Sequence, residues 1–427
     1  MLSGSLRVLR GNILVFAVTD LLGNFARNLV FPYASLYILA LGGDAADIGL
    51  VNSLALFAGL FMLPLAGHVT DRADRVRIIV ISGLLSSLFL SVIALAPDWR
   101  TVAIASLLLG TIVFQFPAYS SLIADSLAPA DRGVGLGMMN MISNSLAILA
   151  PFIAGLLIQR YTANTGMRIL YTVMLVAYLG GSLIQWRFLR ETSAEPRRRL
   201  HLSALVGSLG QSYRAVPGLV RQMSVPLLAL ACVVLLSFMA NAINGPYWVV
   251  YATDHIGFSA AEWGVILLAE SIVRLVAFWP AGLLVDRYGR AHVLFTALAI
   301  GAVTIPLFVV LDSFVGILLS RCAAAVAFSL AMPASMALMA DLVPRSLRGQ
   351  MMAAIGQGGL MLVPAMGGVG GPSLGYLFIP LVMISSLAGG FLYTLNPLYP
   401  WAFSLLATLL SLLLVYIFVR DPQNAEV

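Results

Sequence analysis

The chain has 427 residues, of which 60% are hydrophobic and only 10% are charged, and its mean hydropathy is +0.98. A soluble globular domain cannot bury so much apolar side chain, so this composition excludes that class and indicates a protein whose main solvent is lipid. The net charge of +6 comes from 24 arginines, with no lysine, against 18 acidic residues. Such a balance can indicate nucleic-acid binding, but in an apolar chain it is better explained by membrane topology, so we expect no nucleic-acid partner.

Apolar runs of about 20 residues follow one another along the chain. Backbone polar groups must bond internally in lipid, and runs of this length fit helices rather than the short alternating strands of a barrel. The first run follows Arg7 and Arg10 and is too long for a signal-peptide core, so we expect it to be retained. The sequence predicts an all-α integral membrane protein with twelve spans, at residues 11–41, 46–70, 77–96, 100–124, 134–159, 168–190, 226–252, 260–284, 291–311, 314–340, 374–395 and 399–419.

A polar, arginine-rich stretch divides the twelve spans into two groups of six. We expect an N-terminal six-helix bundle at 1–190, a cytoplasmic basic linker at 191–225 and a C-terminal six-helix bundle at 226–427. Eighteen arginines fall in the alternate segments that share a side with the N-terminus, three fall in the opposite loops and three lie within spans. This bias predicts a multi-pass protein of the cell (plasma or inner) membrane with both termini in the cytoplasm.

The two halves repeat one another in sequence. The stretch GHVTDRADR at 67–75 reappears as GLLVDRYGR at 282–290, and Pro32-Tyr33 reappears as Pro246-Tyr247. Offsets stay between 214 and 216 through four helices, and then Ala154-Gly155 resembles Gly389-Gly390 at an offset near 235. A parallel duplication of this kind is typical of two-halved transporters, and it predicts two pseudo-symmetric bundles.

The extra residues of the second half lie around 356–375, where eight of 20 residues are glycine. Glycine at this density disfavours a continuous helix. We therefore expect a short helix over 351–362 at the inner surface and a cytoplasmic loop over 356–373 before span eleven. The alternative is an additional span at 349–369, which would place Arg420 outside.

The pattern Gly-x-x-x-Asp-Arg-x-Gly-Arg between spans eight and nine, with its variant between spans two and three, resembles the signature loop of the major facilitator superfamily. The resemblance covers the whole chain and implies a secondary active transporter that works by alternating access. Residues 150–155 loosely resemble the span-five motif of drug antiporters, but the arginine expected in span four of proton-coupled antiporters is absent. The resemblance also implies cytoplasmic ion-pair networks that bridge the halves when the site faces outward, formed by Asp71, Arg72, Arg75 and Asp125, and by Asp286, Arg287, Arg290 and Asp341.

Charged and amide side chains within spans are candidate site residues, because a charge at the centre of a membrane helix costs about 2.5–3.5 kcal/mol. Asp20, Asn24 and Arg27 share one face of span one. Glu270 and Arg274 are one turn apart in span eight and can form an ion pair, which either serves function or only fixes helix packing. The substrate-binding residues that we expect, in spans one, four, five, seven, eight and ten, are Asn24, Arg27, Gln115, Asn144, Asn241, Trp248, Arg274 and Arg321.

Asp20 and Glu270 are the two carboxylates well inside spans, so they are the expected proton-coupling residues. Glu270 is also the candidate partner of Arg27 by depth, and its protonation would free Arg27 for a solute. For Arg321 two positions stay open, because its side chain can join the site or snorkel to the outer surface.

Other function classes are disfavoured by missing motifs. The chain has no Gly-x-x-x-x-Gly-Lys phosphate loop, no Ser/His/Asp or histidine-rich grouping, and four histidines without metal-ligand spacing. We therefore expect no enzyme activity, no catalytic residues, no cofactor and no metal site. Nor is there a large polar segment of the kind that a sensor on this fold usually carries. The expected function is proton-coupled export of an amphiphilic solute by a monomer in the lipid bilayer. The alternative, suggested by three intramembrane arginines against two acids, is uptake or exchange of an organic anion.

Overall fold

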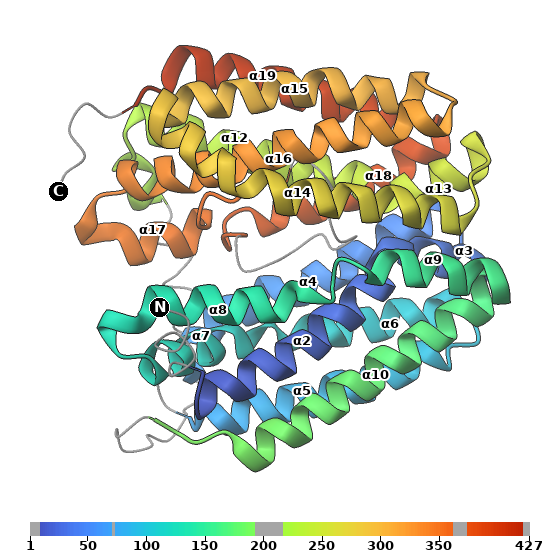
Figure 1. The fold of residues 1–427 in the computed structure, drawn as a ribbon, viewed down its shortest axis with the longest axis horizontal. Coiled ribbons are helices and arrows are strands. Elements are labelled where there is room, and N and C mark those ends of the chain that lie inside the picture. Colours follow the sequence, from blue (N-terminus) through green and yellow to red (C-terminus); the bar gives the residue numbers. More distant parts are fainter. Residues whose placement is uncertain (1–8, 71–72, 193–216, 362–373, 422–427) are drawn as a thin grey trace.

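The computed structural model describes residues 9–70, 73–192, 217–361 and 374–421, and within them all regular structure is helical. The helices form two bundles that lie side by side, the N-terminal half in blue and green and the C-terminal half in yellow to red (Figure 1). Among the described residues, eleven helical segments are long and apolar enough to cross a membrane. A twelfth, α18 (Ile379–Leu395), is equally apolar but has only 17 residues. The prediction of an all-α membrane fold is therefore confirmed.

Several spans of the N-terminal half are built from consecutive helical pieces. In span one, α2 (Asn12–Val30) passes through the 3₁₀ turn η2 (Phe31–Tyr33) into α3 (Ala34–Ala40). The cause is Pro32, which has no amide hydrogen to donate to the helix. The remaining spans of this half are α4 (Ala45–Thr70), α5 (Arg75–Ala94), α6 (Trp99–Gly110) with η3 (Thr111–Phe114) and α7 (Gln115–Ser126), α8 (Arg132–Ser145) with α9 (Ala150–Tyr161), and α10 (Ala163–Phe188).

The C-terminal half repeats this construction. Pro246 takes the place of Pro32, and the first span consists of α12 (Val225–Asn244), η5 (Gly245–Tyr247), α13 (Trp248–Tyr251) and the π-helical turn η6 (Ala252–Ile256). The other spans are α14 (Ala260–Tyr288), α15 (Arg290–Val310), α16 (Phe314–Leu342), α18 and α19 (Tyr399–Phe418).

Short polar caps fix where helices begin. Ser259 and Glu262 form a reciprocal capping box at the start of α14. Asp98 caps α6, accepting hydrogen bonds from the backbone amide and the hydroxyl of Thr101, and these bonds lower the pKa of the Asp98 carboxyl.

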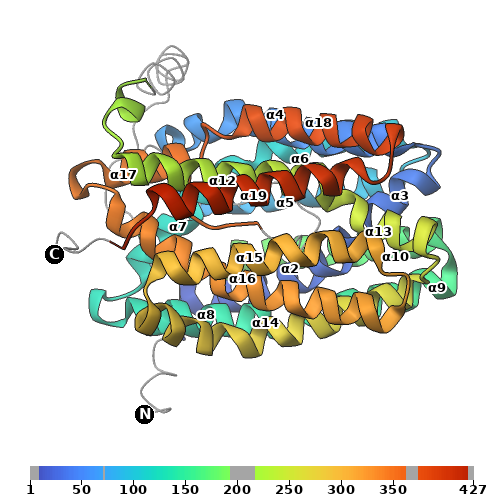
Figure 2. The same ribbon diagram turned by 90° about the horizontal axis from the view of Figure 1, so that it is seen from above.

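The two halves meet more closely at one end than at the other. We call the end that holds Arg75, Asp125, Arg290 and Asp341 the motif end, and the opposite end the far end. Near the far end α9 packs against α14, and α4 packs against α18, as Figure 2 shows for the second pair. The buried apolar side chains of both halves join there in a single cluster, whereas toward the motif end each half has a cluster of its own. The bundle is therefore closed across the far end.

The segment after α16 differs from the sequence expectation. A helix of only eight residues, α17 (Arg348–Ile355), stands where a short helix over 351–362 or a span over 349–369 was considered. It ends at Gly356, whose φ of 85° is a left-handed conformation that glycine adopts readily. Residues 356–361 are not helical, so the alternative of an additional span is wrong for this part, and α18 begins at Ile379 rather than at 374.

Residues 356–361 also do not remain at the surface. The Met361 amide donates to Ser237 Oγ at 3.3 Å, and Leu360 is fully buried. Ser237 lies 12 residues into α12, which is about 18 Å from the start of that helix. The segment therefore re-enters the C-terminal half from the motif end, and the rest of the expected loop, 362–373, lies outside the described residues.

The re-entry can be tested by cysteine labelling. In a background with Cys232→Ser and Cys322→Ser, we expect Gln357→Cys to react quickly with an impermeant maleimide, because Gln357 is exposed. Leu360→Cys should be protected, because its side chain is enclosed by the bundle. Equal labelling rates at the two positions would place the whole segment at the surface.

Candidate functional site

Three charged side chains meet inside the C-terminal half. Glu270 lies between two arginines: one Oε faces Arg274 Nη2, and the other is 2.5 Å from Arg321 Nη2. The Glu270 side chain is 0% exposed and Arg321 is 2% exposed. The predicted ion pair between Glu270 and Arg274 is confirmed. The alternative that Arg321 snorkels to the outer surface is wrong, because a carboxylate on the neighbouring helix holds it in the interior.

Aromatic rings enclose the Arg321 guanidinium. Its Cζ lies 4.4 Å from the ring centroid of Trp248 and 5.7 Å from that of Trp263. Two of its nitrogens, Nε and Nη1, have no hydrogen-bond partner in the described part of the chain. The negative faces of the indole rings provide the compensating interaction instead. Trp248, predicted from the sequence as a substrate contact, is thus part of the packing around a buried charge.

The group formed by Glu270, Arg274 and Arg321, which we call the triad, has one carboxylate for two guanidiniums. Each charge would be costly if it stood alone in the membrane interior, and together they carry a net charge of +1. The carboxylate is therefore the component on which the two arginines depend.

We expect Glu270→Gln to destabilise the protein by about 3–5 kcal/mol, because it leaves two buried guanidiniums without an anion. The double variant Glu270→Gln with Arg321→Gln should recover part of this loss, because it also removes the more deeply buried cation. The measurement is thermal unfolding of the purified variants in one detergent. A double variant no more stable than the single one would contradict this dependence.

The N-terminal half holds a second polar cluster, on the predicted face of α2. Tyr119 Oη donates to Asp20 Oδ2, and Arg27 Nη2 donates to Asn24 Oδ1. Asn24 Nδ2 in turn donates to the Ser143 carbonyl at 3.2 Å, which joins α2 to α8. Asp20, Asn24 and Arg27 are only half-buried, in contrast to the triad.

The expected pairing of Arg27 with Glu270 is not observed. Both oxygens of Glu270 face arginines of its own half, and Arg27 finds its partner one turn away in Asn24. The similar depth of Arg27 and Glu270 in their spans therefore did not predict a contact between them, because each forms its polar contacts within its own bundle.

The other predicted contacts lie apart from these two clusters. Asn144 is exposed, and its amide donates to the Asn140 carbonyl of its own helix. Asn241 lines a small interior pocket of about 20 Å³ between α12, α15 and α19, so it faces the inside of the C-terminal half. Gln115 is half-buried at the first position of α7. The structure thus does not gather all eight predicted substrate residues in one place.

At the motif end, the predicted networks form ion pairs within each half. Arg75 Nη1 lies 2.5 Å from Asp125 Oδ2, and Arg290 pairs with Asp341 at the equivalent position. Neither pair bridges the halves in this structure, and bridging in an outward-facing state stays a prediction. Asp286 and Arg287 are exposed, and Asp71 and Arg72 lie outside the described residues.

Two acidic residues in the same region were missed by the sequence reasoning. Glu191 Oε2 accepts from the Arg75 amide at 2.8 Å, and Asp421 Oδ1 accepts from the Arg290 amide at 2.8 Å. Each acid follows the last span of its half and caps the third span of that half. A signal was present, because Arg190-Glu191 and Arg420-Asp421 repeat each other just beyond spans six and twelve.

At the far end, two buried tyrosines join the halves. Tyr33 Oη lies 2.9 Å from the Pro151 carbonyl and 3.2 Å from the carbonyl of Ala260, the first residue of α14. Tyr247 Oη donates at 2.9 Å to the carbonyl of Ala45, the first residue of α4. The two tyrosines and the two acceptor alanines are equivalent in the repeat, so one contact is the pseudo-symmetric copy of the other. We call this pair of contacts the latch.

Glycines allow the helices to approach closely beside the latch. A side chain at Gly155 would collide with the Ala260 carbonyl, and one at Gly390 would collide with the backbone of Ala45 and Ala46. Ser386 also donates across the halves, to the Gly49 carbonyl at 3.3 Å. The repeated glycines Gly155 and Gly390 therefore lie where the two bundles touch.

We expect Tyr247→Phe to weaken closure of the far end by about 1 kcal/mol, because it removes a net hydrogen bond between the halves and keeps the ring. Tyr33→Phe should weaken it by less, because the shorter contact of that hydroxyl is to Pro151 of its own half. The effects should add in the double variant. Closure can be measured by the distance between spin labels at Leu95 and Leu395, which are exposed at the far end of opposite halves. Tyr161→Phe, at an exposed tyrosine, is the matched control. Unchanged distance distributions in the double variant would show that the hydroxyls do not hold the halves together.

The chain matches the Major Facilitator Superfamily over residues 16–226 and 230–427. The chain belongs to this superfamily. As a major facilitator protein it is a membrane transporter and not an enzyme, and its twelve spans, its repeated halves and its motif-end ion pairs fit that membership.

Individual relatives of this major facilitator protein are distant. It is 22% identical over 67% of its length to an uncharacterised MFS-type transporter of Methanocaldococcus jannaschii, covering 69% of that protein. It is 27% identical over 64% of its length to the multidrug resistance protein MdtG of Citrobacter koseri, covering 66% of that protein.

Solved structures share its fold. The nucleoside transporter NupG superposes with a TM-score of 0.68 at 15% identity, with 95% of this chain and 98% of that one covered. A bacterial homologue of the iron transporter ferroportin in an inward-facing state superposes with a TM-score of 0.69 at 14% identity, and 97% of this chain and 98% of that one are covered.

Proposed function

We propose that this transporter exports an amphiphilic organic compound across the cell membrane in exchange for protons, by alternating access. The relatives named multidrug resistance protein MdtG support this direction and this solute class. The observation that carries the proposal is the half-buried Asp20 carboxylate, hydrogen-bonded to Tyr119 on the face of α2 that also holds Asn24 and Arg27. A carboxylate inside a span that is not committed to an ion pair is suited to take up and release a proton.

Asp20 is better placed for this role than Glu270. Asp20 lies eight residues into α2, about 12 Å from the motif end, and it is partly exposed. Glu270 is fully buried between two arginines that need its charge. We therefore assign proton exchange mainly to Asp20, and to Glu270 a part in holding the two arginines of the triad inside the C-terminal half.

We further propose that the motif end is cytoplasmic, because the arginine-rich segments lie at that end. The far end then faces the outside, and the structure with its closed latch is an inward-facing state. The ion pairs Arg75–Asp125 and Arg290–Asp341 belong to the cytoplasmic gate, whose exposed members are Asp286 and Arg287. Each chain contains both halves of the pathway, which is consistent with a monomer as the working unit.

A second candidate function, transport of an organic anion, is favoured by one specific observation. The triad carries two guanidiniums for one carboxylate, and within the described part of the chain Arg27 hydrogen-bonds to the neutral side chain of Asn24. Net positive charge within the membrane interior attracts an anionic group of a solute.

Transport in proteoliposomes with an imposed pH gradient tests the proposal. The probes are tetraphenylphosphonium, an amphiphilic cation, and a carboxyfluorescein, an organic anion. We expect proton-driven transport of the cation, lost in Asp20→Asn, while solute counterflow without a pH gradient persists. The matched control is Asp131→Asn, at an exposed carboxylate of the motif end. Full pH-driven activity of Asp20→Asn would exclude Asp20 as the proton site, and transport of the anion alone would favour the second function.

A further inference from the structure

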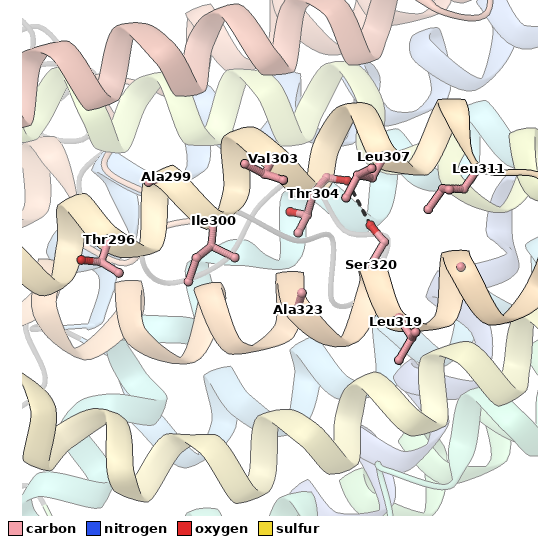
Figure 3. Close-up of a pocket in the computed structure, with 11 residues that line it drawn as sticks. Thr296, Ala299, Ile300, Val303, Thr304, Leu307, Leu311, Leu319, Ser320 and Ala323 are labelled. Carbon is pink, nitrogen blue, oxygen red and sulfur yellow. Dashed lines mark hydrogen bonds between the residues drawn. The ribbon is translucent and has the colours of Figure 1, made fainter.

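A hollow on the outside of the C-terminal half lies between α15 and α16 (Figure 3). Its volume is about 670 Å³, and it opens outward between Val303 on α15 and Leu319 on α16, which are 60% and 63% exposed. The hollow exists because small residues line it where the two helices meet, namely Ala299, Gly316 and Ala323. Neither helix carries a large side chain at these positions that could fill the space.

The polar atoms in the lining are already hydrogen-bonded. Ser320 Oγ donates to the Thr304 carbonyl at 3.2 Å, as the dashed line in Figure 3 shows, and Thr304 Oγ1 donates to the Gly301 carbonyl at 3.3 Å. Thr296 Oγ1 donates to the His292 carbonyl at 2.9 Å. Sites for polar solutes offer a few unsatisfied polar groups that fix orientation, and these hydroxyl protons are committed. The hollow therefore suits an apolar occupant.

The surroundings and the shape of the hollow identify that occupant. Both α15 and α16 are membrane-spanning, so this outward face borders the hydrocarbon of the bilayer. Along α15 the lining runs from Thr296 to Leu311, about 22 Å of a hydrocarbon core that is about 30 Å thick. An apolar hollow of this length along the helices can take an extended acyl chain. A second copy of the protein would need a flatter surface, of about 800 Å² on each partner.

Charged residues at the two ends of the hollow favour one orientation of the lipid. At the motif end, His292 lies one turn before Thr296 on the same face, and its side chain is 85% exposed, close in sequence to Arg290. In its doubly protonated form, with Nδ1 3.9 Å from Asp421, His292 has an Nε2–H that can donate to a phosphate oxygen. The Asp421 carboxylate already accepts hydrogen bonds from the Arg290 and Ala291 amides, at 2.8 and 3.0 Å. At the far end, the residue after Leu311 is the exposed Asp312, which repels a phosphate.

We propose that the α15/α16 hollow is a phospholipid site, with the acyl chain along the hollow and the phosphate beside His292 at the motif end. The site is separate from the transport pathway, because it lies on the outer face of one half. The inference rests only on the membrane position of these helices and not on the solute or the coupling ion.

Photo-crosslinking in nanodiscs tests the site. The probe is a phosphatidylglycerol with a diazirine at the end of one acyl chain, and crosslinked peptides are identified by mass spectrometry. We expect the crosslinks to concentrate on residues 296–323. Ala323→Phe, which fills the hollow, should reduce them at least about fivefold, a change of about 1 kcal/mol in occupancy. The matched control Leu406→Phe, at an exposed position of α19, should not reduce them.

Two further variants keep the result decisive. If Ala323→Phe does not fold, Leu319→Gln makes the rim polar and should give the same loss. His292→Ala should lower crosslinking by phosphatidylglycerol while leaving the transport rate of the cationic probe unchanged. Crosslinks spread evenly over all lipid-facing helices, or crosslinks between two copies through α16, would overturn the proposal.

Discussion

The closed far end depends on a contact that occurs twice. Tyr33 and Tyr247 reach across from the first span of each half to the backbone carbonyl at the start of a span in the other half. Glycines beside them let the backbones come close enough for those bonds. A hydrogen bond of this kind contributes only about 0.5–1.5 kcal/mol, so the latch fixes the geometry of closure, and the apolar cluster that both halves share at this end contributes to its energy as well. Contacts of small individual energy suit a transporter, because they must form and break in every cycle.

The interior charges divide according to depth and burial. The triad lies nearer the far end, its Glu270 and Arg321 are buried, and its ion pairs lie within the C-terminal half. The cluster around Asp20 lies nearer the motif end, is partly exposed and contains only one formal charge of each sign. A buried ion group of the first kind resists changes in protonation or in partners, because the loss of one partner leaves a buried charge without compensation. A half-buried group of the second kind can change its protonation and its partners at lower cost.

Much of this architecture could be predicted from the sequence, because apolar runs and repeated motifs report directly on spans and symmetry. The pair Glu270–Arg274 was predictable as well, since one helical turn fixes its geometry. The partner of Arg27 was not predictable, because the depth of a residue along its span gives neither the rotation of the helix about its axis nor the helices that pack around it. The caps Glu191 and Asp421 were missed for a similar reason: their targets lie more than a hundred residues away in the chain.

Glycine accounts for one place where the halves stop matching. Span five of the first half continues through α8 and α9, whereas its counterpart in the second half has α18, with 17 residues, preceded by the non-helical segment 356–361. Non-helical backbone at membrane depth is tolerated only where protein or a water-filled cavity surrounds it, and here Ser237 binds the Met361 amide while Leu360 is enclosed. Interrupted helices in transporters concentrate where ions and solutes bind. The duplication therefore supplied two similar bundles that meet at a symmetric latch, and the glycine-rich insertion made the inner part of the C-terminal bundle different from its copy.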